Sequence, residues 1–139
     1  MTDSVNHPKH YTSHPSGVEA IEITRWLRGP YSNACKYIMR GWEGLKGDPI
    51  EDLQKSLWYL NDAEKFPDDG ESLPYDAEMK WGLYRKNEKL KEKSECLGFI
   101  LMASEREGWE DSPTEYISAA KKLIQERIAY LQSRPDVAL

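Results

Sequence analysis

A helix-start signature that occurs twice is the feature that most limits the folds open to this chain of 139 residues. The segments "DPIE" (48–51) and "SPTE" (112–115) both place a capping residue before a proline, with a glutamate three residues after the cap. The capping oxygen binds free backbone amides, proline suits the first helical position, and the glutamate completes a capping box. Apolar residues follow at helical spacing, so we expect helices over 48–66 and 112–133.

Three more segments have helical spacing of apolar residues. They are 17–28, which Gly29-Pro30 should end, 32–42, and a long segment over 77–104. Its charged middle, "RKNEKLKEKSE" (85–95), is typical of a solvated helical face. No stretch alternates with the period of a strand. The sequence therefore predicts an all-α protein, a small helical bundle with an extended N-terminal arm and a C-terminal helical hairpin.

The chain divides into two halves of different character. Residues 1–66 hold a histidine-rich arm and three helices, residues 67–76 form an acidic linker rich in proline and glycine, and residues 77–139 form the hairpin. A protruding hairpin would leave its apolar stripes in water, which is unfavourable, so it either folds back on the first three helices or packs against copies of itself. The charged middle of the long helix argues against complete burial inside one small bundle. We therefore expect a homo-oligomer, with the C-terminal helices supplying the interface.

Composition excludes several classes of protein. A formal charge of -5 argues against long nucleic acid as a partner, because phosphate binding needs a concentrated positive surface. No apolar run approaches the roughly 20 residues that span a bilayer, and the N-terminus lacks a signal-peptide core. Cys35 and Cys96 are too few and too far apart for a disulfide framework or a CxxC zinc site. We expect a cytoplasmic protein without a membrane partner.

All three histidines lie in one short segment, "NHPKHYTSHP" (6–15). Pro8 and Pro15 prevent a helical register, and no acidic residue completes a tetrahedral zinc site, so we expect no metal here. Consecutive histidines, typical of an affinity tag, are absent. Two interpretations stay open: a flexible arm with incidental histidines, or an arm that folds over a ligand.

A second group of polar and aromatic residues occupies two neighbouring helices. Its members are Asn33, Lys36, Tyr37 and Arg40 on the first helix, Lys46 in the turn, and Asp52, Lys55, Trp58 and Tyr59 on the second. Lysine and arginine side chains on adjacent turns can hold a phosphate, and aromatic rings can stack on a base. The alternative is ordinary pairing between helices, for example Lys36 with Asp52.

Three segments in order resemble a family of small phage proteins. They are "VNHPKHYTSHPSGVEAIEI" (5–23), "SNACKYIMRG" (32–41) and "EDLQKSLWYL" (51–60). The family has an HPxHY box, a GNAxKYxxR-type segment and a DLxKAxWYL-type helix, and it includes a deoxynucleoside monophosphate kinase without a P-loop. The chain departs from it in the turn "GWEGLKG" (41–47), where Lys46 is the single basic residue.

The resemblance implies a phage protein of the host cytoplasm that binds a nucleotide. Residues that fall on its motifs, or lie beside them, become site candidates. The candidates for catalysis are His7, His10, Lys36 and Arg40; those for substrate binding are Asn6, Tyr11, Asn33, Tyr37, Lys46, Asp52, Lys55, Trp58 and Tyr59. No tightly bound cofactor is expected; ATP or another nucleoside triphosphate would donate the phosphate, and a need for magnesium stays open.

Two other functions compete with a kinase. The chain lacks a GxxxxGK[ST] phosphate loop, so phosphate would have to be held by side chains. All-α nucleotide pyrophosphohydrolases hold magnesium with paired carboxylates, but Lys55 stands where a second carboxylate would be needed. A non-enzymatic phage protein that sequesters nucleotides or binds a host protein is the stronger alternative.

Overall fold

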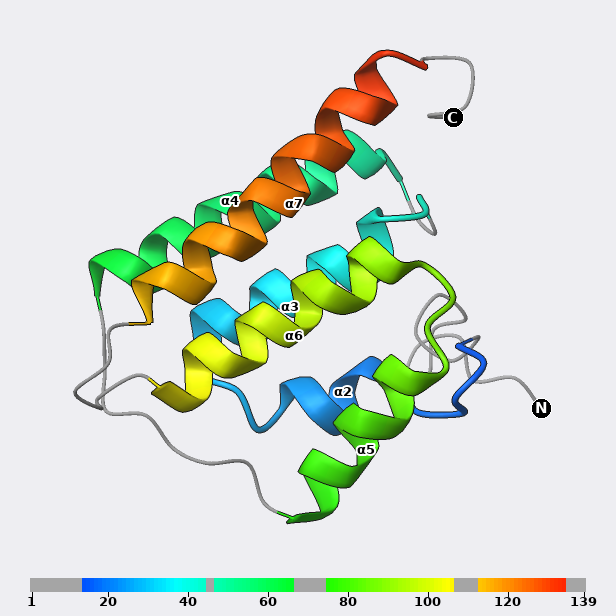
Figure 1. Cartoon of the computed structure of the whole chain (residues 1–139), viewed down its shortest axis with the longest axis vertical. Coiled ribbons are helices and arrows are strands. Elements are labelled where there is room, and N and C mark those ends of the chain that lie inside the picture. Colours follow the sequence, from blue (N-terminus) through cyan, green and yellow to red (C-terminus); the bar gives the residue numbers. More distant parts are fainter. Residues whose placement is uncertain (1–13, 45–46, 67–74, 107–112, 135–139) are drawn as a thin grey trace.

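The computed structural model describes residues 14–44, 47–66, 75–106 and 113–134 (Figure 1). These ranges contain α-helices and no strand, which confirms the all-α prediction. The helices are α2 (Ala20–Thr24), α3 (Gly29–Gly41), α4 (Pro49–Lys65), α5 (Tyr75–Lys86), α6 (Lys91–Arg106) and α7 (Thr114–Gln132). The arm over residues 1–13 lies outside the described residues.

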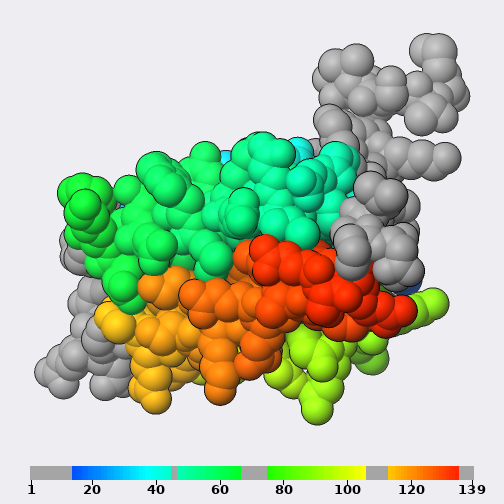
Figure 2. Space-filling view, turned by 90° about the horizontal axis from the view of Figure 1, so that it is seen from above, coloured from blue at the N-terminus to red at the C-terminus, as the bar shows by residue number. Residues whose placement is uncertain are grey.

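The four longest helices pack together as a bundle. α3 packs against α4 and α6, and α7 packs against α4 and α6. Figure 2 shows α4 and α7 side by side on one face of the molecule. The short helix α2 contacts α3 and α5, so α2 and α5 lie together below the bundle in Figure 1.

One hydrophobic core joins both halves of the chain. It includes Ile23, Ile38, Leu53 and Leu60 from the first half, and Trp81, Leu97, Ile100, Ile117 and Ile124 from the second. The stripes of α6 and α7 are therefore buried within one chain and do not require a second copy to cover them. The homo-oligomer remains a prediction, but uncovered stripes on the C-terminal helices α6 and α7 no longer support it.

The prediction of one long helix over 77–104 is wrong, because the helix is interrupted between α5 and α6. At the break, Asn87 Nδ2 donates to the Leu83 carbonyl, and the Leu90 amide donates to Glu88 Oε2. The Leu90 amide thus binds a side chain in place of the carbonyl four residues earlier that it would meet in a continuous helix, while the Leu83 carbonyl keeps its helical bond from the Asn87 amide. α5 also starts two residues early, so that Tyr75 and Asp76 belong to it and not to the linker.

This break changes which residues of α5 face the core. Ala77, Trp81 and Tyr84 are buried, whereas Met79 and Leu83, expected on the apolar stripe, are largely exposed. Because α5 and α6 have different axes, an apolar face assigned by treating them as one continuous helix cannot be the buried face of both.

The N-terminal helix is also shorter than expected. α2 covers five residues, and Gly29-Pro30 begins α3 instead of ending the helix before it. Proline fits there because the first turn of a helix has no acceptor for its amide. Ile21 and Trp26 are about half exposed.

The start of α4 agrees with expectation, whereas that of α7 does not agree fully. Pro113 is the N-cap of α7 and not its first helical residue, and it makes no side-chain cap bond; Ser112, the expected cap, lies outside the described residues. Asp48 caps α4, since its Oδ1 accepts hydrogen bonds from the amides of Ile50 and Glu51 at 2.9 and 3.4 Å. On α7 the predicted stripe is mostly buried, at Ala120, Ile124, Ile128 and Leu131. Within the part of the chain that the structure describes, no helix is long and apolar enough to cross a bilayer.

Candidate functional site

The polar strips of α3 and α4 meet through one bidentate ion pair. Arg40 Nη2 donates to Asp52 Oδ1 at 2.8 Å, and Arg40 Nε donates to Oδ2 at 3.1 Å. Both side chains are largely shielded from solvent. The pairing between helices that the sequence suggested therefore exists, but the partner of Asp52 is Arg40 and not Lys36. Such a fork fixes the two helices in register.

Gly41 permits the close approach of α3 and α4 at this point. A Cβ atom added to Gly41 would lie 2.6 Å from Asp52 Cβ and 3.4 Å from the Pro49 carbonyl oxygen. The neighbouring atoms belong to the backbone and to the first carbon of a side chain, so they cannot easily move aside. A larger residue here would separate the helices beside the Arg40–Asp52 pair.

Three cations surround the ring of Tyr37. Arg40 Cζ lies 4.7 Å from the ring centroid, Lys55 Nζ 5.4 Å and Lys36 Nζ 5.6 Å. These distances are within the roughly 6 Å of a cation–π contact. The structure thus brings together the basic residues that the sequence suggested for phosphate binding, with an aromatic ring at their centre.

A row of aromatic rings extends from Tyr37 on α3 to Tyr59 and Trp58 on α4. The Tyr37 and Tyr59 rings stack with centroids 5.9 Å apart, and Trp58 meets Tyr59 edge-on at 5.1 Å. Trp58 is 62% exposed although it is a large apolar side chain. An exposed indole three residues after Lys55 on α4 can stack on a planar ligand and leave the lysine to bind an anionic group.

Among the remaining candidates, only Asn33 lies in the described part of the chain, and its side-chain amide is bonded within α3. Asn33 Nδ2 donates to the Gly29 carbonyl one turn earlier on α3. Asn6, His7, His10, Tyr11 and Lys46 lie outside the described residues. Among the residues that are described, no three His, Cys, Asp or Glu side chains group as metal ligands.

A buried polar cluster at the α5–α6 junction was not predicted. Lys93 Nζ lies 2.9 Å from Glu88 Oε1 and 3.1 Å from Glu43 Oε1. Lys93 belongs to the run that was interpreted as a solvated helical face, and that interpretation is wrong at this position. The signal was present, since Lys93 lies three and four residues before Cys96 and Leu97, on the core face of α6.

His14 attaches the end of the N-terminal arm to this cluster. Its ring stacks on Tyr84 with centroids 3.6 Å apart, and its Nε2 lies 3.2 Å from Glu88 Oε1. Burial lowers the pKa of His14, although Glu88 opposes the shift. Burial acts to raise the pKa of Glu88, but the hydrogen bond and charge of Lys93 outweigh it, so the net shift is downward. One of the three clustered histidines therefore has a structural role.

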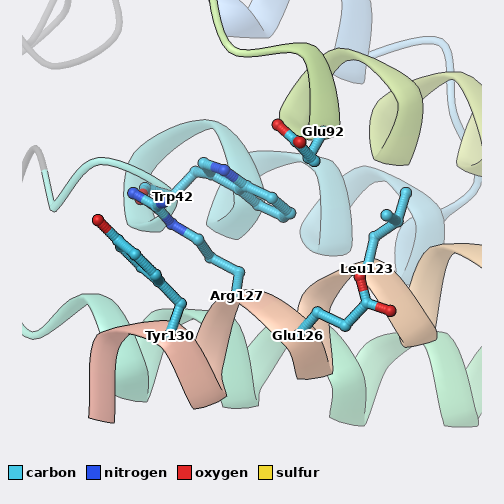
Figure 3. Close-up of a pocket in the computed structure, with 6 residues that line it drawn as sticks. All are labelled: Trp42, Glu92, Leu123, Glu126, Arg127 and Tyr130. Atoms are coloured by element: carbon cyan, nitrogen blue, oxygen red, sulfur yellow. The ribbon is translucent and has the colours of Figure 1, made fainter. Parts of the chain in front are cut away.

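A cavity of about 320 Å³ lies between the end of α3, α6 and α7 (Figure 3). The Arg127 guanidinium lies between Trp42 and Tyr130 and donates twice to the Trp42 carbonyl, at 2.9 and 3.1 Å. Glu92 and Glu126 border the same cavity. Two carboxylates beside one committed guanidinium disfavour an anionic ligand in this cavity.

A family of proteins of unknown function, DUF3310, has a model that matches residues 5–61. The match covers the arm and α2 to α4, and therefore includes the Tyr37 cluster. No curated protein and no solved structure matches the chain. The resemblance to a small family of long-unknown function is confirmed to this extent; the phage origin and the kinase activity stay predictions.

Proposed function

We propose that this protein binds a nucleotide on the outer face of α3 and α4. The observation that carries the proposal is the convergence of three cations on the Tyr37 ring, next to the exposed Trp58. A phosphate would bind between Lys36 and Lys55, while the base would stack on the rings of Trp58 and Tyr59. Arg40 positions Tyr37 and α4, because its Nε and Nη2 already bind Asp52.

In this proposal the N-terminal arm closes the site. The arm enters the described structure at His14, whose contacts lead through Glu88 and Lys93 to Glu43. Glu43 follows Arg40 by three residues, so the arm is attached near the C-terminal end of α3. Asn6, His7, His10 and Tyr11 would then supply donors to the ligand from residues 6–11.

The reaction proposed is transfer of a phosphoryl group to a deoxynucleoside monophosphate, with a nucleoside triphosphate as the donor. Such transfer depends on positioning and on neutralising charge, which lysines can provide without a P-loop. In direct transfer, an oxygen of the monophosphate would attack the γ-phosphorus and release the nucleoside diphosphate, with an imidazole of His7 or His10 as acid or base. In a two-step reaction, the imidazole would first take the phosphoryl group, release the nucleoside diphosphate and then pass the group to the monophosphate. The activity rests on the family resemblance, and nucleotide binding rests on the geometry of α3 and α4.

A non-enzymatic protein that sequesters nucleotides is the second candidate, and one contact favours it. The best phosphate-binding side chain of the cluster, Arg40, is engaged by Asp52, which leaves Lys36, and Lys55 in its solvent-exposed pair with Glu51, to attract phosphate electrostatically. A pyrophosphohydrolase is disfavoured, because two carboxylates of α4 are paired with cations, Asp52 with Arg40 and Glu51 with Lys55.

A thermal-shift panel of nucleoside mono-, di- and triphosphates tests the proposal. A ligand that binds the native state alone raises the melting temperature. Lys36→Ala and Lys55→Ala should each weaken binding by about 1–3 kcal/mol. Lys65→Ala, at the far end of α4, is the matched control and should bind normally. Product analysis of a nucleotide that binds then separates a kinase from a sequestering protein, and a chain that responds to no nucleotide contradicts both.

A further inference from the structure

The outer face of α5 carries an apolar stripe that nothing in the described chain covers. Tyr75, Met79 and Leu83 recur every four residues and are 74%, 58% and 46% exposed. The opposite face of the same helix, with Ala77, Trp81 and Tyr84, is already buried in the core. α5 is therefore apolar on two sides, whereas a surface helix normally buries one. The second side is typical of an interaction surface.

Gly82 lies within this stripe, and its position is unexplained by the single chain. A glycine inside a helix destabilises it relative to alanine. A Cβ atom added at Gly82 would meet nothing within 4 Å, so no contact within the described part of the chain requires glycine there. Next to Met79 and Leu83, the missing side chain leaves a hollow on the helix surface that can accept a side chain from outside.

The charges of α5 indicate what covers the stripe. Its first turn carries Asp76 and Glu78, and its last turn carries Lys86, whereas Arg85 turns toward α6 and donates to the Ser94 carbonyl. Two copies of α5 packed antiparallel would set the acidic turn of each against the basic turn of the other. Such self-complementarity is the property of a two-fold interface between identical chains.

We propose that the protein forms a two-fold symmetric dimer through α5. With the axis between Met79 and Gly82, Met79 of each copy fills the hollow at Gly82 of the other. The same register brings Asp76 of one copy near Lys86 of the second. A single helix of 12 residues is smaller than a standard interface of roughly 800 Å² per partner, so the dimer dissociates at micromolar concentration. The proposal is independent of nucleotide binding.

Sedimentation analysis of the full chain, from about 1 to 500 μM, tests the dimer. We expect a reversible monomer–dimer equilibrium. Met79→Glu should raise the dissociation constant at least about tenfold, and so should Gly82→Gln, which improves the helix while filling the hollow. Met102→Glu, which changes an exposed methionine on α6, is the matched control and should leave the equilibrium unchanged.

A charge exchange tests the register. Asp76→Lys and Lys86→Asp should each weaken the dimer, and an equimolar mixture of the two variants should recover it, because both cross-pairs are then opposite in charge. A chain that stays monomeric over the whole range overturns the proposal and assigns the stripe to another protein. A dimer that survives Met79→Glu, or a mixture that does not recover, also overturns it.

Discussion

Lys93 Nζ lies 2.9 Å from Glu88 Oε1, and their side chains are only 1% and 5% exposed. Glu88 lies in the break between α5 and α6, and Lys93 lies on the core face of α6. The pair therefore joins two helices at the point where a single long helix was expected. It also holds His14, the first described residue of the arm.

Lys93→Met should reduce the free energy of unfolding by about 3–5 kcal/mol, because it leaves the Glu88 carboxylate buried without its cation. Lys91→Met is the control. Lys91 is two residues away but 83% exposed, so its loss should cost less than about 0.5 kcal/mol. Urea unfolding measures both. The deficit of Lys93→Met should shrink in acid, where Glu88 can protonate; a cost equal to that of Lys91→Met would show that the pair contributes nothing.

The titration of His14 should make the free energy of unfolding depend on pH. Because burial lowers its pKa, the unfolded chain binds more protons than the folded chain below the ordinary value of 6.5. Stability is therefore complete above that value and is lost as the pH falls through the folded pKa. Glu88, Lys93, Glu43 and Tyr84 face this ring or its partner, and the lowered pKa of Glu88 adds a loss only below its ordinary value of 4.5.

We expect the melting temperature to fall between about pH 7.5 and 5.5, and His14→Gln should flatten that dependence. A melting temperature that rises on acidification would mean that the pairing of His14 with Glu88 dominates over burial.

Gly41→Ala should destabilise the protein by about 1–3 kcal/mol, although alanine is the better helix former. The added methyl group would overlap Asp52 and force α3 and α4 apart. Gly82→Ala makes the same change in another helix where space is open, and in dilute protein it should stabilise by up to about 1 kcal/mol. Thermal unfolding of the two variants gives the comparison, and equal signs would disprove the close approach.

Leucines on one face of α4 should differ in their contribution. Leu53 is fully buried and Leu57 is only partly buried, although the sequence pattern treats them alike. Leu53→Ala should cost about 2–5 kcal/mol in urea unfolding, and Leu57→Ala clearly less. Trp58→Ala serves as the exposed control and should cost little stability. A larger loss of stability at Leu57 than at Leu53 would contradict the structure, because it would mean that Leu57 and not Leu53 faces the core.

The sequence by itself determined the helical class, the start of α4 at Asp48 and the buried stripe of α7. These features depend on residues within one or two turns of each other, so local spacing and capping chemistry specify them. It also placed Lys36, Tyr37, Arg40 and Lys55 on facing strips, because a short turn joins the two helices.

Only the tertiary structure decided the features that depend on distant residues. The partner of Asp52 and the burial of Lys93 each follow from what another part of the chain presents at that place. From the local sequence, a charged residue such as Lys93 is expected to be solvated. It is stable in its buried position because Glu43 and Glu88, from other parts of the chain, pair with it. Helical periodicity shows which residues share a face, whereas packing decides which of two apolar faces is buried, as it does on α5.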